Sequence, residues 1–175
     1  MIRFAFAALL AISFAAAANA AAKIQRVISP GGIEAWLVEE HAIPIIAIEI
    51  SFDGGAVLDP EGKEGVAVLL AGTLEEGAGD LDAVGFAEVA DDIAARFGFD
   101  AGRESVSVSA RMLTENRDAT IDLLKTALTA PRFDEEPVAR VKNQIISGIR
   151  SSETDPNSIA GKAFAEAAFP GDPYG

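Results

Sequence analysis

The side chains that could do chemistry in this chain are almost all carboxylates. The sequence holds 27 Asp and Glu residues, a single histidine, His41, and no cysteine. Thiolate catalysis, disulfides and cysteine-based zinc sites are therefore excluded. A pair of histidines four residues apart, the arrangement that holds hydrolytic zinc on one face of a helix, is excluded as well.

His41 is the only side chain that could act as the base of a Ser-His-Asp triad. It stands beside the break at Pro44, which predicts an exposed loop position, and no Gly-x-Ser-x-Gly turn is present to carry a nucleophile. The glycine-rich pieces at 31–32, 54–55 and 77–79 lack the spacing of phosphate-binding or dinucleotide-binding loops. We therefore interpret them as turns and expect no triad.

Carboxylate-only sites are the chemistry that remains. Two groups lie close enough in sequence to hold a calcium or magnesium ion: Asp59, Glu61 and Glu64, and Glu75, Glu76 and Asp80. Neither has the spacing of a calcium-binding loop, so solvated loops are the simpler interpretation. An autonomous enzyme that uses the second group is kept as one alternative hypothesis.

The composition predicts one folded and acidic domain. The chain has 175 residues, half of them hydrophobic, which suffices for a core of its own. Its formal net charge is -13, which argues against nucleic acid or anionic lipid as a partner. The same charge favours solubility and would suit a basic partner surface or basic peptides.

The first twenty residues have the pattern of a secretory signal. Arg3 gives a positive start, residues 4–18 form an apolar run, and Ala18-Asn19-Ala20 is a small-x-small cleavage site. We predict a signal peptide over 1–20, cleaved after Ala20 or Ala22, and a periplasmic or secreted product. An uncleaved anchor is the alternative, although the run is short for a bilayer, which needs about 20 apolar residues. No cysteine follows it, which excludes a bacterial lipoprotein, and no later segment could cross a membrane.

Alternation and β-branched residues predict the strands. Residues 23–29 and 33–39 flank a Pro-Gly-Gly turn, which predicts a hairpin. Residues 45–52 are rich in isoleucine and apolar on both faces, which predicts a central strand. In the stretch 105–112 serines alternate with apolar residues, so we expect a strand with one wet and one buried face.

Apolar residues at helical spacing predict five helices: 64–74, 82–97, 114–130, 134–152 and 155–169. We expect the first to be buried, the second to be capped by Asp82 and stopped by Gly98, and the last to turn Ile159 and Phe164 inward. Strands and helices are segregated along the chain. The fold class is therefore predicted as α+β, an antiparallel sheet covered on one face by helices.

The strand at 45–52, the loop at 53–65 and the helix after it resemble the N-terminal domain of the insulinase/pitrilysin (M16-type) zinc peptidases. Active members carry Gly-Leu-Ala-His-x-x-Glu-His at this helix, where two histidines bind zinc and the glutamate is the general base. Gly65-Val-Ala matches the lead-in. The resemblance then places the first histidine at Val68, the glutamate at Ala71 and the second histidine at Gly72, so all three functional groups are lost.

Later segments also resemble the family. They are Phe99-Asp-Ala-Gly-Arg-Glu with the serine-rich strand, the turn Thr129-Ala-Pro-Arg-Phe133, and Phe169-Pro-Gly-Asp-Pro-Tyr-Gly175. Alignment on Pro156 puts the family's third ligand, a glutamate, near Ser147 or Gly148, neither of which binds zinc. The resemblance covers residues 23–175 and implies an M16/LuxS-like metallohydrolase half-domain that is incomplete at its C-terminal end.

The resemblance implies a metal-less, non-catalytic subunit with no cofactor of its own. In several bacterial and organellar systems, a family member of this kind pairs with a zinc-bearing M16-type partner, and the two enclose a peptide chamber. The leading hypothesis is therefore an exported subunit that helps such a partner bind unfolded peptides for proteolysis. The edge of the first hairpin could bind a peptide by strand addition. The alternative is an interaction or scaffold module that has no role with peptides.

Overall fold

The computed structural model describes residues 23–172, so the predicted signal peptide at 1–20 lies outside the described residues. The chain divides into two compact units, Met1–Ile43 and Pro44–Gly175. In the first unit the elements are β1 (Ile24–Ile28) and β2 (Glu34–Val38). In the second they are β3 (Ile45–Asp53), η1 (Ala56–Leu58), α2 (Val66–Thr73), β4 (Gly77–Ala78), β5 (Leu81–Asp82), α3 (Ala83–Asp92), β6 (Arg96–Ala101), β7 (Ser105–Leu113), η2 (Thr114–Asn116), α4 (Arg117–Thr129), α5 (Glu135–Ser152) and α6 (Pro156–Ala168).

The first unit is the predicted hairpin. Strands β1 and β2 pair antiparallel, with Ile24 opposite Val38 and Ile28 opposite Glu34. The turn is closed by a hydrogen bond from the Ser29 amide to the Ile33 carbonyl (2.8 Å) and by one from the Ile33 amide to the Ser29 hydroxyl (3.0 Å). A serine side chain that binds backbone in this way stabilises a tight turn.

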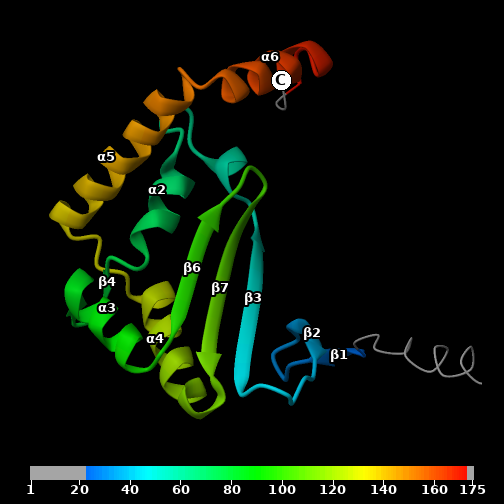
Figure 1. Ribbon diagram of the computed structural model, residues 1–175, viewed down its shortest axis with the longest axis vertical. Helices are drawn as coiled ribbons and strands as arrows, with labels where there is room; N and C mark the ends of the chain where they lie inside the picture. Colours follow the sequence, from blue (N-terminus) through cyan, green and yellow to red (C-terminus); the bar gives the residue numbers. More distant parts are fainter. Residues whose placement is uncertain (1–22, 173–175) are drawn as a thin grey trace, which may run out of the picture. The chain divides into compact units, whose positions relative to one another are not determined.

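The second unit is built on an antiparallel sheet of three strands in the order β3-β7-β6 (Figure 1). The central strand is β7, and its predicted alternation is confirmed, because Val108, Ala110 and Met112 are buried. The prediction that 45–52 is the central strand is wrong within residues 23–172. Among the described strands, β3 pairs with β7 alone. Its face that carries Glu49 and Ser51 is exposed, so half of the strand needs no apolar cover.

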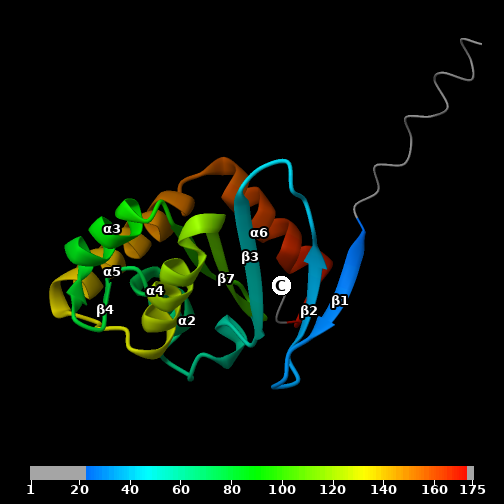
Figure 2. The same cartoon turned by 90° about the horizontal axis from the view of Figure 1, so that it is seen from below.

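The core lies between this sheet and the helices that cover its apolar face (Figure 2). Leu123 and Leu124 of α4 are buried there, one against Phe86 of α3 and the other against the inward residues of β7. Phe97 and Phe99 of β6 pack against both clusters, which joins them into one core. An α+β fold with helices on one face of an antiparallel sheet, as predicted, is confirmed.

Strand β6 is not predicted from the sequence, and neither are the two-residue strands β4 and β5. The predicted helix over 82–97 begins as expected, because the Asp82 carboxylate accepts a hydrogen bond from the Gly85 amide (2.8 Å). It ends at Asp92, well before Gly98, because Ala94 takes a left-handed conformation (φ 50°). The chain then enters the sheet at Arg96, where Phe97 becomes a strand residue of the core.

Helices α5 and α6 follow at the C-terminal side. The predicted helix over 134–152 is confirmed, and Asp155 caps α6 by accepting a hydrogen bond from the Ser158 amide (2.7 Å). The inward orientation expected for Ile159 and Phe164 is wrong in the described residues, since both are exposed, Phe164 by 71%. Between residues 23 and 172 there is no helix both long enough and apolar enough to cross a membrane.

Candidate functional site

The loop that leads into α2 is fixed by the hairpin between β6 and β7. Gly55 is buried at φ 90°, and a Cβ atom there would lie 2.5 Å from the Gly102 carbonyl oxygen, so only glycine fits. The next amides donate to this hairpin, Ala56 to Gly102 (3.0 Å) and Val57 to Arg103 (2.9 Å). The start of α2 is therefore held at a set place beside the sheet.

Asp59 caps α2 from this loop. Its carboxylate accepts hydrogen bonds from the amides of Gly65 (2.7 Å) and Ala67 (2.9 Å). The N-cap residue, Gly65, has no side chain to do this, so Asp59 supplies the cap from outside the helix. Glu64 accepts a hydrogen bond from the Gly62 amide (3.0 Å). Of the three acidic residues Asp59, Glu61 and Glu64, two therefore have carboxylates that accept hydrogen bonds from backbone amides of the loop and the helix start.

Helix α2 carries the positions where the family resemblance places the zinc ligands. Ala71 is buried, with 4% of its surface exposed, whereas Val68 is 37% exposed. At Gly72 the neighbouring helix α5 comes so close that a Cβ atom would lie 2.9 Å from Cγ1 of Val141. Position 71 is therefore closed by packing, whereas Gly72 is exposed and a side chain added there would meet Val141.

The residues present do not fit a zinc ion. Val68, Ala71 and Gly72 have no imidazole or carboxylate, and the same is true of Ser147 and Gly148 at the expected third position on α5. Among the residues that the structure describes, no group of three or more His, Cys, Asp or Glu side chains could hold a metal ion. Water activation of the metallopeptidase kind cannot be built on this set of donors.

Strand β6 places an open sheet edge next to α2. It pairs with β7 along one side, and no described strand pairs with its other side. Helix α2 contacts both β6 and α5, so it lies between an unpaired strand edge and a neighbouring helix (Figure 1). An edge of this kind offers free backbone N–H and C=O groups to an extended peptide.

A cleft of about 620 Å³ adjoins the start of β6. Its floor is apolar and includes Phe86, Ala95 and Phe97. Its charged rim comes from four segments, the turn after α2, helix α3, the start of β6 and helix α5: Glu75, Glu76, Glu88, Asp91, Arg96 and Arg140. The cleft therefore combines an apolar base with charges of both signs.

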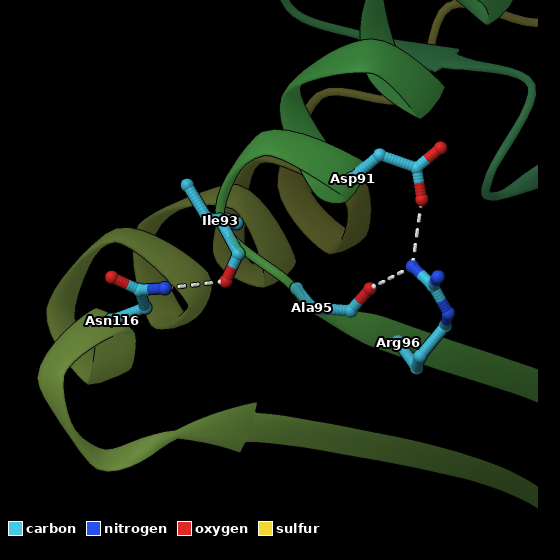
Figure 3. A network of polar contacts seen from close by, with 5 residues as sticks. All are labelled: Asp91, Ile93, Ala95, Arg96 and Asn116. Carbon is cyan, nitrogen blue, oxygen red and sulfur yellow. Dashed lines mark hydrogen bonds and ion pairs between the residues drawn. The ribbon is translucent and has the colours of Figure 1, made fainter.

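Two ion pairs order this rim. Arg140 of α5 binds Glu76, which ties the turn after α2 to a helix far along the chain. Arg96 binds the Asp91 carboxylate (2.7 Å) and the Ala95 carbonyl oxygen (2.9 Å), as Figure 3 shows. In the same figure the Asn116 amide group donates to the Ile93 carbonyl (2.7 Å), which secures the bend between α3 and β6.

Glu75 differs from its neighbours because no described cation pairs with it. Partial burial raises the pKa of the Glu75 carboxyl above its ordinary value, and the adjacent Glu76 adds to the rise. The sequence suggested Glu75, Glu76 and Asp80 as a possible site. Glu75 and Glu76 line the cleft, whereas Asp80 is exposed in the turn between β4 and β5 and lies outside it. The structure therefore does not bring all three together.

Sequence reasoning missed the cleft and the open edge, and with them the roles of Arg96 and Arg140. The alternation of Phe97, Phe99 and Ala101 with Gly98 and Asp100 was a strand signal, but it was hidden by the helical spacing that precedes it. No local signal could have paired Arg140 with Glu76, because the two residues are 64 positions apart.

Relatives of known sequence match most of the chain. The profile of the family described as insulinase (peptidase family M16) matches residues 36–175. A Helicobacter pylori protein named non-peptidase homolog YmxG is 30% identical over 135 residues, which cover 77% of this chain and 31% of that protein. A Rickettsia felis protein named uncharacterized zinc protease is 25% identical over 130 residues, 74% of this chain and 32% of that protein.

Solved structures agree with these matches. A crystal structure of a peptidase M16 inactive domain from Pseudomonas fluorescens superposes with a TM-score of 0.74 at 25% identity, and the match covers 82% of this chain and 35% of that one. A crystal structure of a Helicobacter pylori protease shares the fold, with a TM-score of 0.69 at 14% identity over 83% of this chain and 35% of that one. The chain spans about a third of the length of these proteins. By sequence and by fold, the chain belongs to the insulinase family, peptidase family M16.

Proposed function

We propose that this chain is a non-catalytic M16 subunit that binds unfolded peptides for a zinc-bearing M16 partner. The observation that carries the proposal is helix α2. It contacts β6 and α5, while Val68, Ala71 and Gly72 stand where the resemblance places the zinc ligands and the general base. A helix that packs beside the sheet edge but has no metal-binding side chain at these positions suits a role in binding.

The chemistry of the site supports the non-catalytic part of the proposal. Peptide hydrolysis of the zinc type needs a metal-bound water and a carboxylate base beside it. Neither can be assembled from the side chains at positions 68, 71 and 72. Two relatives have names of the same sense, a non-peptidase homolog and a peptidase M16 inactive domain, although the Rickettsia felis relative is named a zinc protease.

The open edge of β6 supports the peptide-binding part. An extended peptide that adds to a sheet edge gains main-chain hydrogen bonds whatever its sequence, which suits unfolded substrates. The edge lies next to α2, so a peptide bound along β6 would lie beside a helix that holds no metal ligand at positions 68, 71 and 72. A zinc-bearing partner would then perform the hydrolysis. The signal-like residues 1–20 would bring this chain to the periplasm, so the partner would carry a signal of its own.

Strand addition makes a specific prediction about peptide chemistry. The full chain should bind a fluorescein-labelled unfolded peptide, measured by fluorescence anisotropy, and should leave it uncleaved. N-methylation of alternate backbone amides that face the protein should abolish binding. The same modification shifted by one residue should leave binding intact, because only alternate amides of a strand face its neighbour.

Two outcomes would count against the proposal. Equal binding of both N-methylated peptides would exclude strand addition, and no binding of any unfolded peptide would favour a scaffold without a role with peptides. Cleavage should begin only when a zinc-bearing M16 protein from the same cell is added. Cleavage by the chain alone would contradict the non-catalytic assignment.

A further inference from the structure

The cleft beside β6 is not used by main-chain strand addition, so it is free for a side chain. We propose that it receives the side chain of a lysine or arginine from a peptide that lies along β6. This inference rests on the proposed function, which supplies the peptide. It adds a preference for basic peptides to a binding mode that is otherwise indifferent to sequence.

The shape of the cleft fits a long side chain with a polar end. The floor holds Phe86, which is 2% exposed, Ala95, which is 1% exposed, and Phe97. Lys and Arg bury their methylene stems on such surfaces and keep the charged head at the rim. A short polar side chain would leave the floor uncovered, and an aliphatic one would leave the rim without a partner.

The charges of the rim favour a cation. Four carboxylates face two guanidinium groups, and each guanidinium already binds a carboxylate, Arg140 with Glu76 and Arg96 with Asp91. Glu75 and Glu88 are left without a cationic partner among residues 23–172. An anionic side chain would meet a net negative rim, whereas a Lys or Arg head could pair with Glu75.

The position of Glu75 singles it out as the main partner. It follows α2 by two residues and lines the cleft next to Glu76, whose own charge is bound by Arg140. The pKa of the Glu75 carboxyl is raised by burial and then by Glu76, so its ionised form would gain from a nearby cation. Glu88, on α3, lies on the rim as a second acceptor.

The test compares two unfolded peptides that differ at one residue, lysine against norleucine, which has the same stem and no charge. We expect the full chain to bind the lysine peptide about fivefold more tightly, the size of a partly exposed ion pair. Glu75→Gln should bring the ratio to about one. Glu135→Gln, an exposed carboxylate in the first turn of α5 outside the cleft, should leave the ratio unchanged.

A charge reversal at the same position keeps the test informative if Glu75→Gln merely makes the protein less stable. Glu75→Lys should prefer a peptide with glutamate at the variable residue over the lysine peptide, which simple instability cannot produce. Equal binding of the lysine and norleucine peptides by the parent chain would overturn this inference and leave the proposed function standing. An unchanged ratio in Glu75→Gln would overturn the assignment to this cleft, and no binding of either peptide would remove both proposals.

Discussion

At the scale of single residues, Gly72, where the resemblance places the second histidine, lies close against helix α5. A side chain longer than hydrogen at this position meets Val141 of α5, because even a Cβ atom would lie 2.9 Å from its Cγ1. A histidine at position 72 would therefore need Val141 on α5 to give way.

This closeness predicts coupled energies for Gly72→His and Val141→Ala. Gly72→His should lower the free energy of unfolding by about 1–3 kcal/mol, because it overpacks the contact between the helices. Val141→Ala alone should also destabilise, since it removes buried methyl groups. The double variant should be more stable than the sum of the two losses predicts, as measured by urea unfolding. Strictly additive losses would show that the helices do not meet at Gly72.

Glu75 should leave a mark on the pH dependence of stability. Its pKa is raised above the ordinary 4.5 by burial and by Glu76, so the folded state favours the protonated form. The stability that this form contributes is present below the ordinary pKa and is lost as pH rises through the raised value. Glu75→Gln should therefore match the parent at low pH and be the more stable of the two at neutral pH.

The charges that face Glu75 set the conditions of that test. Glu76 lies beside it, Arg140 of α5 binds Glu76, and Glu88, Asp91 and Arg96 share the rim. The Glu88→Gln variant is the matched control, because it removes an exposed carboxylate from the same rim. Thermal unfolding midpoints across the pH range would be compared, and a constant difference between parent and Glu75→Gln at every pH would contradict the assignment.

Among the elements, α2 depends on a cap that comes from outside it. Asp59→Ala should lower the free energy of unfolding by about 1 kcal/mol, because two amides at the start of the helix lose their acceptor. Asp59→Asn, which keeps one acceptor oxygen, should cost less. Glu61→Ala, in the same loop, should have little effect, and a loss equal to that of Asp59→Ala would show that capping is not the cause. Urea unfolding of the three variants measures the difference.

Much of the element order could be predicted from local pattern, and the failures have physical causes. The Ser/Val alternation gave β7 and the Asp-Pro pair gave the start of α6, since each signal is complete within a few residues. Strand β6 was missed because its aromatic residues continue the helical spacing of α3, and the break comes from the backbone at Ala94. Whether these residues form a helix or a strand is decided by their pairing with β7, and strand pairing cannot be inferred from a single sequence.

The site was predicted to a different degree. The emptied positions on α2 could be read from residue types, because Val68, Ala71 and Gly72 have no metal-binding atoms in any fold. The close approach of Val141, the open edge of β6 and the cleft rim could not, since each depends on segments far apart in the chain. The sequence therefore indicated what the site lacks, and the structure shows what lies around it.

At the scale of the whole molecule, the chain spans about a third of the length of its matched relatives. Within residues 23–172, α6 presents apolar side chains to solvent, among them Ile159 and Phe164. The sheet and its helices nevertheless form one core without them. Peptide binding, the partner and export are accordingly proposals about the molecule as a whole, while the absence of metal-binding atoms at positions 68, 71 and 72 is a property of this chain.

The zinc content of the purified full chain, after equilibrium dialysis against zinc, tests the central claim most directly. We predict no bound zinc above that of a matched protein without a metal site, because no imidazole or carboxylate stands at positions 68, 71 and 72. One tightly held zinc ion per chain would contradict it. That result would mean that other side chains of this protein form a metal site, and that the role of α2 has been misread.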